Sequence, residues 1–173
     1  MSYPGYQPQP PPPGYGAPAG AAYASVGKRI LAHIIDGFIA GLGGIPGIIL
    51  MIIGIALAAS TADSRGQISG DAGAGAIGII VLAYAVIFLG MVALWLYNCY
   101  LLGRDGATIG KRLMKIKVLD GQGLPLGFGK ALLREIVKYA LGSACFILLL
   151  WPLWDEQKQG LQDKMFGTHV FEA

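Results

Sequence analysis

The chain has 173 residues, of which 54% are apolar and only 13% are charged, and its formal net charge is +3. This charged share is about half of what soluble globular domains carry. Two stretches, Gly37 to Ala62 and Ala72 to Gly103, contain no charged residue, and each exceeds the roughly 20 residues that a helix needs to cross a bilayer. The composition therefore predicts an integral membrane protein and excludes a cytosolic enzyme or a secreted disulfide scaffold.

Residues 1–27 differ in composition from the rest of the chain. Seven of the ten prolines fall in the first 18 residues, among tyrosine, glycine and glutamine. Because proline fixes φ and has no backbone N–H, we predict a disordered tail here, without helix or strand. This tail is either a spacer or a docking segment, since tyrosines between prolines can stack in the aromatic groove of a protein partner.

Residues 28–173 predict a mainly α-helical membrane domain with about three transmembrane helices, over residues 28–59, 74–102 and 128–154. Pro46 lies in the middle of the first helix and should kink it. The third helix requires that the charged residues in its first turns lie at the membrane interface and extend their charged ends toward water.

Basic residues indicate the orientation. Residues 103–134 carry seven of the thirteen lysines and arginines, so the positive-inside rule places this loop and the N-terminus in the cytoplasm of a cell-membrane protein. Residues 115–119 partly alternate and precede Asp120-Gly121, which predicts a short strand and a turn. If residues 169–171 pair with it as a second strand, the C-terminus lies on the same side. A single third crossing would instead place residues 155–173 outside.

Residues 128–139 also predict an amphipathic helix at the membrane interface. Lys130, Arg134 and Lys138 are spaced by four and share one face. A basic face beside a transmembrane segment suits the surface of an anionic leaflet. A ligand site on this face is the alternative interpretation.

Three polar residues form one stripe on the first predicted helix. At 100° per residue, Arg29, His33 and Asp36 share a face, and Asp36 lies about 10 Å along the axis from Arg29. An unpaired carboxylate in hydrocarbon costs several kcal/mol. Asp36 is therefore either paired with Arg29, Arg134 or Lys138 to fix helix packing, or it handles an ion or ligand. His33 either relays a proton or is a packed polar residue.

The two cysteines, Cys99 and Cys145, lie in apolar stretches, which is typical of buried thiols that act as small hydrophobic groups. The sequence contains no arrangement typical of a Ser/His/Asp site, a metal cluster or a phosphate-binding loop. We therefore expect no catalytic residues, no metal and no cofactor.

Arg29 at the head of the first helix and Asp36 seven residues later resemble the RDD family of bacterial integral membrane proteins, named for one arginine and two aspartates. The segment GRDGATIGKRLMKIKVLDGQG is similar to the Gly-x-Thr-x-Gly-Lys block of this family. Its positions here are Gly106, Thr108, Gly110 and Lys111. The segment QGLQDKMFGTHVF is similar to the closing motif and places the second aspartate at Asp163. The resemblance covers residues 25–173.

The resemblance implies transport of an unknown ligand, and sodium–proton exchange has been proposed for some members. We predict a transport or cation/proton exchange component in which Asp36 carries the ion, Arg29 tunes its charge and Asp163 gates at the surface. Such a small carrier would need to be an oligomer. The alternative is a scaffold or accessory subunit that binds partners through its tail and its glycine-rich helix faces.

The expected partners are the lipid bilayer, a second copy or another membrane protein, and a protein that docks on the tail. Nucleic acid is not expected.

Overall fold

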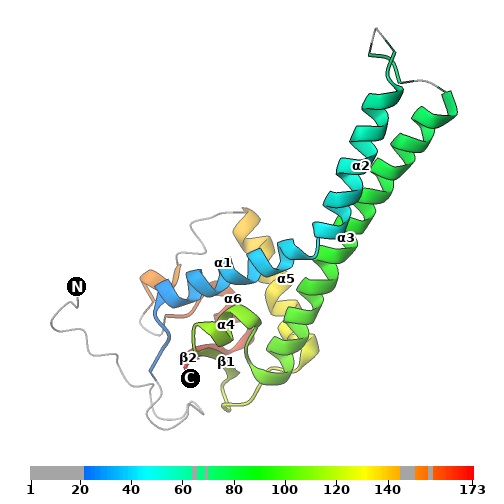
Figure 1. Ribbon diagram of the computed structural model, residues 1–173. Helices are drawn as coiled ribbons and strands as arrows, with labels where there is room; N and C mark the ends of the chain where they lie inside the picture. The colour runs from blue at the N-terminus through cyan, green and yellow to red at the C-terminus, as the bar shows by residue number, and fades with distance from the viewer. Residues whose placement is uncertain (1–21, 64–65, 69, 145–150, 156–157) are drawn as a thin grey trace. The chain divides into compact units, whose positions relative to one another are not determined.

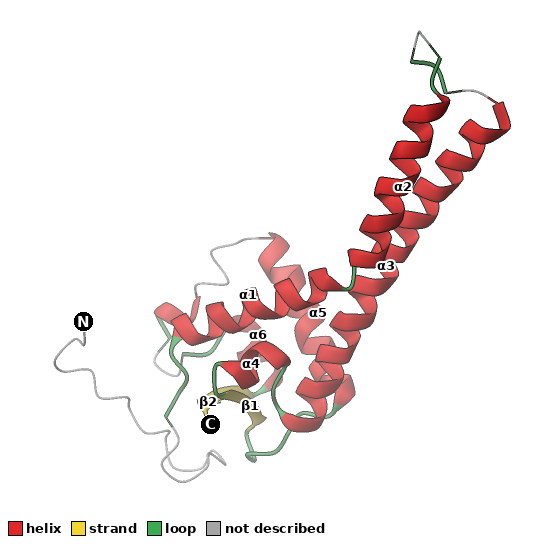
Figure 2. Ribbon diagram, in the orientation of Figure 1, coloured by secondary structure: helices red, strands yellow, loops and turns green. Residues whose placement is uncertain are grey.

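The computed structural model describes residues 22–63, 66–68, 70–144, 151–155 and 158–173. They are mostly helical, with a small two-stranded sheet (Figures 1 and 2). The chain divides into two compact units, which we describe separately. Unit 1 comprises Met1–Asp36 and Leu96–Ala173, and unit 2 comprises Gly37–Trp95. Residues 1–21 of the predicted tail lie outside the described residues.

Unit 2 is a helical hairpin of α2 (Ile45–Thr61) and the first part of α3 (Gly70–Asp105), which lie side by side in Figure 1. Glycines allow the two backbones to approach closely. A Cβ atom at Gly90 would collide with the carbonyl of Gly43, and one at Gly47 would lie 2.6 Å from the backbone nitrogen of Ile87. These glycines therefore face the other helix of the same chain.

The outer surface of the hairpin is apolar. Large aliphatic and aromatic side chains are exposed along both helices, including Ile49, Ile52, Val81, Phe88 and Leu89. Contiguous apolar surfaces of this kind mark contact with a membrane or a partner protein. The hairpin therefore has the surface expected of a membrane-associated protein.

The described residues contain one helix that is long and apolar enough to cross a membrane by itself, α3, with 36 residues. It contains the predicted helix 74–102 and extends beyond both of its ends. α1 (Val26–Leu42) and α2 pass the same test only as a pair, and they are bent by 48° at the break between them. If this pair counts as one span, the described residues contain two candidate spans.

The structure divides the predicted helix 28–59 into two helices at a glycine pair. α1 ends at Leu42 and α2 begins at Ile45, so Pro46 lies in the first turn of α2, where its missing N–H is not needed. In a continuous helix, the ring of Pro46 would clash with the carbonyl of Leu42, four residues earlier. The proline therefore separates two helices instead of kinking one.

Unit 1 contains the predicted two-stranded element. β1 (Ile116–Asp120) and β2 (Thr168–Glu172) pair antiparallel, with Val118 opposite Val170. Both valines are buried and pack with the apolar core of the unit. The chain just before α1 adds to the free edge of β2, because the N–H of Ala24 donates to the carbonyl of Val170 at 2.9 Å.

This pairing decides between the two alternatives for the C-terminal segment. Paired strands lie about 4.8 Å apart, whereas the hydrocarbon core of a bilayer is about 30 Å thick. β1 and β2 must therefore lie on the same side of any membrane that the chain crosses. A single crossing between them is incompatible with the register of the sheet.

Three further helices complete unit 1: α4 (Ile109–Leu113), α5 (Phe128–Ala144) and α6 (Leu161–Phe166). α6 contacts both α5 and β2, and α4 contacts β1. α5 begins where the amphipathic helix was predicted, and its described part reaches Ala144, within the apolar stretch of the predicted third span. Residues 145–150 of that span lie outside the described residues.

Candidate functional site

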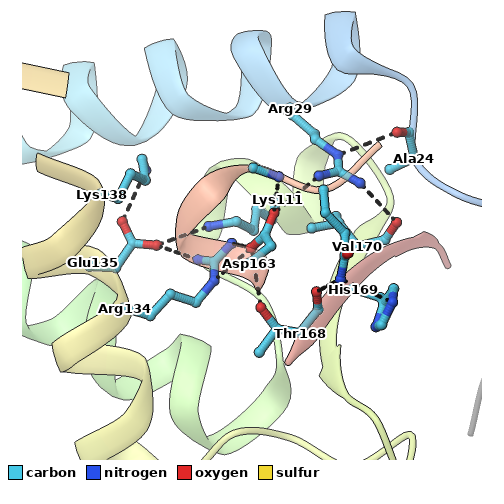
Figure 3. A network of polar contacts seen from close by, with 12 residues as sticks. Ala24, Arg29, Lys111, Arg134, Glu135, Lys138, Asp163, Thr168, His169 and Val170 are labelled. Carbon is cyan, nitrogen blue, oxygen red and sulfur yellow. Dashed lines mark hydrogen bonds and ion pairs between the residues drawn. The ribbon is translucent and has the colours of Figure 1, made fainter. Parts of the chain in front are cut away.

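Arg29, the first residue of the polar stripe of α1, points toward Asp163 in unit 1 (Figure 3). The guanidinium of Arg29 donates to Asp163 Oδ2 at 3.3 Å. It also donates to the backbone oxygens of Val170 and Ala24, each at 3.3 Å. Leu31, on the opposite side of the helix, is 46% exposed. Arg29 therefore ties the start of α1 to α6, to β2 and to the segment that precedes the helix.

Asp163 is the centre of the network, and its side chain is only 2% exposed. Its Oδ1 accepts from Arg134 Nε at 3.0 Å, Arg134 Nη2 at 2.5 Å and Thr168 Oγ1 at 3.2 Å. Its Oδ2 accepts from the N–H of Gly160 at 3.0 Å as well as from Arg29. Burial alone would raise the pKa of Asp163, but the charges of Arg134 and Arg29 hold it below its usual range. This carboxylate is ionised and fully engaged, and it does not lie at the surface, where the predicted gating role would need it.

A second carboxylate, Glu135, extends the network along α5. It accepts from Arg134 Nη1 at 2.8 Å and from Lys138 Nζ at 2.9 Å, and Lys111 Nζ lies 3.9 Å away. Burial would raise the pKa of Glu135, but these three cations hold it well below its usual range. Lys138 Nζ also lies 3.2 Å from His33 Nδ1. Because an ammonium group only donates, Nδ1 is the acceptor and the proton of the neutral ring is on Nε2.

The prediction of a basic lipid-facing surface on α5 is wrong for two of its three residues. Arg134 is buried and bonded to Asp163 and Glu135. Lys138 is mostly buried and bonded to Glu135. A buried carboxylate needs compensating charge, and the inward face of α5 supplies it. The third residue, Lys130, is half-buried, and its charge acts on Asp120.

The segment after α3 shows a physical reason for three of the four residues of the family block. Gly106 has a φ of +71°, which favours glycine. Thr108 caps α4, because its Oγ1 accepts from the N–H of Lys111 at 3.3 Å. A Cβ atom at Gly110 would lie 2.9 Å from Asp36 Oδ1. Only glycine lets α4 approach α1 this closely.

Asp36 joins α1 to this segment. Its Oδ2 accepts from the hydroxyl of Thr108 at 2.5 Å, and its Oδ1 accepts from the N–H of Gly110 at 2.7 Å. The three basic residues that the sequence suggested as partners bond elsewhere in the described part of the chain. The structure thus places Asp36 in a fixed contact, but its donors are a hydroxyl and a backbone amide instead of a cation.

A cavity of about 310 Å³ lies beside the network. Its polar lining includes four cationic side chains and one carboxylate, contributed by Arg29, Lys111, Arg134, Lys138 and Asp163. Aliphatic side chains also line it: Val26, Ile30, Ile34, Pro152 and Val170. The lining thus combines charged and apolar side chains.

Lys111 is the least compensated cation of this lining. Its side chain is 11% exposed, and its nearest carboxylate oxygen in the described part of the chain is Glu135 Oε1 at 3.9 Å. Burial lowers the pKa of Lys111 to about 8, although the charge of Glu135 opposes this shift. An anion that entered the cavity would find this ammonium only weakly engaged.

Sequence reasoning did not identify Glu135 as a member of the site, and it named Thr108 only as part of the family block, without its bond to Asp36. Glu135 is the one acidic residue between Gly121 and Trp154, and an acid inside an otherwise basic amphipathic segment is a sign of internal pairing. Thr108 directly precedes a short helical pattern, which is the usual position of a cap. Its bond to Asp36, 72 residues earlier in the chain, has no local signal.

Comparisons with known proteins agree with the resemblance. The model of the RDD family matches residues 23–167. The proline-rich antigen of Mycobacterium leprae (strain TN) is 32% identical over 156 residues, which are 85% of this chain and 60% of that protein. Proline-rich antigen homologs of two Mycobacterium tuberculosis strains are 39% identical over 75 residues, which are 43% of this chain and 31% of theirs. The chain thus spans 60% or less of the length of these curated relatives, and no solved structure matches it.

Proposed function

The chain belongs to the RDD family, and we propose that it is a membrane-embedded binding component of a transport process, with an anion held in the cavity of unit 1 as its ligand. The observation that carries this proposal is the charge of the lining, where four cations face one carboxylate. Even when Glu135 and Asp36 behind the lining are included, the cations outnumber the carboxylates. Electrostatic attraction therefore favours an anion in this cavity.

The four cations do not contribute equally to this proposal. Arg29 and Arg134 are bonded to Asp163, and Lys138 is bonded to Glu135. Lys111 has only its distant contact with Glu135. Because a buried cation without a close partner is costly, an anion that bonds to Lys111 would lower the free energy of the bound state.

We further propose that unit 1 lies on the cytoplasmic side. The excess of lysine and arginine in residues 103–134 supports this orientation through the positive-inside rule. The pairing of β1 with β2 supports the same side for the C-terminal segment. The ligand would then enter from the cytoplasm or from the inner leaflet.

The proposal is tested by ligand-dependent stabilisation of the full chain, purified in mild detergent. Inorganic phosphate is the probe, and chloride at equal ionic strength is the reference. Phosphate should raise the melting temperature of the protein and of Lys130→Gln, which removes an equal charge outside the cavity, but not that of Lys111→Gln. Equal shifts in all three proteins would overturn the proposal.

Cation or proton exchange through Asp36 is the second candidate. Its support is that the Asp36 carboxylate is bonded by two neutral donors, so its negative charge is available to a cation. Against this role, both oxygens already hold α4 in place. The alternative of a scaffold with a docking tail is supported by the proline content of residues 1–18 and by the words "proline-rich" in the names of the relatives. All of these proposed roles are non-enzymatic.

A further inference from the structure

The lining of the cavity combines cationic with aliphatic side chains, and two of the aliphatic residues are also exposed on α1. Ile30 and Ile34 line the cavity, and they are also 44% and 60% exposed. They are one helical turn apart, so they share a face. We infer that the occupant of the cavity is an anionic phospholipid, with its phosphate beside Lys111 and its acyl chains along this face of α1. This inference rests on the proposed function.

The cations of the lining suit a phosphate monoanion. Lysine binds phosphate as a point charge with three donors. The ammonium of Lys111 has no carboxylate oxygen closer than 3.9 Å among the described residues. Two of the three N–H groups of the Lys138 ammonium bond to Glu135 and His33, which leaves one N–H for a ligand. Two ammonium groups from different helices, α4 and α5, can therefore contact one phosphate.

The size of the cavity argues for a ligand that is only partly enclosed. At about 310 Å³, it is at the lower limit of sites for small ligands, which are roughly 300–1,000 Å³. A phosphate with its glycerol fits this volume, but a phospholipid with two acyl chains does not. The chains must then leave the cavity past Ile30 and Ile34, which are the aliphatic residues exposed at its edge.

Charge selects between lipid classes. Phosphatidylcholine, a zwitterionic lipid, carries a quaternary ammonium next to its phosphate, and this group would be repelled by a lining that already holds four cations. A lipid with a neutral polar group beside its phosphate meets no such repulsion. Anionic lipids are also enriched in the cytoplasmic leaflet, which is the side proposed for unit 1.

The test measures lipid binding to the full chain by native mass spectrometry. Phosphatidylglycerol and phosphatidylcholine with identical acyl chains are titrated separately, and each titration is repeated with inorganic phosphate as a competitor. Phosphatidylglycerol should bind with saturation and more tightly than phosphatidylcholine, and phosphate should compete with it. Lys111→Gln should weaken the binding of phosphatidylglycerol about tenfold, whereas Lys130→Gln should leave this affinity unchanged.

A second variant separates a lipid from a soluble anion. Ile34→Gln lies at an exposed position, so the fold tolerates it. This variant should weaken the binding of phosphatidylglycerol about threefold or more and leave the binding of inorganic phosphate unchanged. If phosphate binds through Lys111 but the two lipids bind equally, or Ile34→Gln has no effect, the lipid inference fails and the proposed function stands. If neither the binding of phosphatidylglycerol nor the binding of phosphate depends on Lys111, both the lipid inference and the proposed function fail.

Discussion

The guanidinium of Arg134 bonds to Asp163 through two nitrogens, with Nε 3.0 Å and Nη2 2.5 Å from Oδ1, and both side chains are almost fully buried. Loss of one partner leaves the other charge uncompensated in the interior. We expect Asp163→Asn to lower the free energy of unfolding by about 3–5 kcal/mol, measured by chemical denaturation in detergent.

The exposed pair of Lys28 and Glu172, 2.7 Å apart, is the matched control for that variant. Surface pairs contribute about 0–1 kcal/mol, so Lys28→Gln should change the free energy of unfolding only slightly. If Asp163→Asn is no more destabilising than Lys28→Gln, the network around Asp163 does not stabilise the fold.

Asp36→Asn distinguishes a structural contact from an ion carrier. An asparagine accepts through one oxygen only, so either Thr108 or Gly110 loses its acceptor. We expect a loss of about 1–3 kcal/mol and faster hydrogen exchange at the Gly110 amide. The exchange role would be favoured instead if the Asp36→Asn protein keeps wild-type stability but no longer moves cations across vesicle membranes.

Lys111 should make the free energy of unfolding of the protein depend on pH in the alkaline range. Its pKa is about 8 in the fold, against an ordinary value of 10.5 for a lysine, so between these pH values the unfolded chain binds more protons than the folded one. Stability should therefore rise with pH across this window. The groups around Lys111 are Glu135, Arg134 and Lys138 on α5 and Asp36 on α1.

Lys111→Gln should remove that rise, measured as the difference in unfolding free energy between pH 7.5 and 10 for variant and wild type. Affinity for phosphate should fall above pH 8 in the wild type as the ammonium deprotonates. Identical pH profiles for the two proteins would show that Lys111 titrates normally.

The contact between Gly43 and Gly90 should tolerate no side chain. A Cβ atom at Gly90 would collide with the Gly43 carbonyl, whereas one at Gly78, on the same helix, meets nothing within 4 Å. Gly90→Ala should therefore lower the melting temperature of the detergent-solubilised protein, at a cost of about 1–3 kcal/mol. Gly78→Ala should leave it unchanged or slightly higher, because alanine favours helix. Equal effects would contradict the close packing of α2 on α3.

The sheet requires the loop after α3 and the C-terminus to share a side. We expect epitopes placed at Gly121 and at Ala173 to be accessible from the same face of the membrane, which we propose is the cytoplasmic one. An epitope at Gly70, beyond α2, should be accessible from the other face. Opposite accessibility of Gly121 and Ala173 would mean that β1 and β2 do not pair in the membrane.

Features with a local physical cause were predictable from the sequence. The long apolar run of α3 follows from its lack of charge, and the amphipathic division of α1 follows from the spacing of Arg29, His33 and Asp36. β1 was recognisable from its alternation and the turn after it. The pairing of β1 with the segment around His169 was one of two open alternatives, because the sequence alone did not determine the side of the C-terminus.

The break between Leu42 and Ile45 was predictable as an irregularity but not as a division into two helices. Pro46 has the same local effect in a kinked helix and at the start of a new one. The outcome depends on whether the preceding turn is held by other contacts. Here Gly43 packs against Gly90, 47 residues later in the sequence, and that contact has no local signal.

The sequence by itself determined the membrane character, the family and the polar face of α1, because these depend on composition and on spacing along one helix. Only the tertiary structure decided which charges meet. Arg134 and Lys138 had the spacing of a lipid-facing basic surface, but they turn inward, because Asp163 and Glu135 are buried and an uncompensated buried carboxylate is costly. The sequence offered three cations as partners for Asp36, but the carboxylate bonds to Thr108 and Gly110. Gly110 has no side chain, so α4 lies close enough to α1 for a hydroxyl and a backbone amide to reach Asp36.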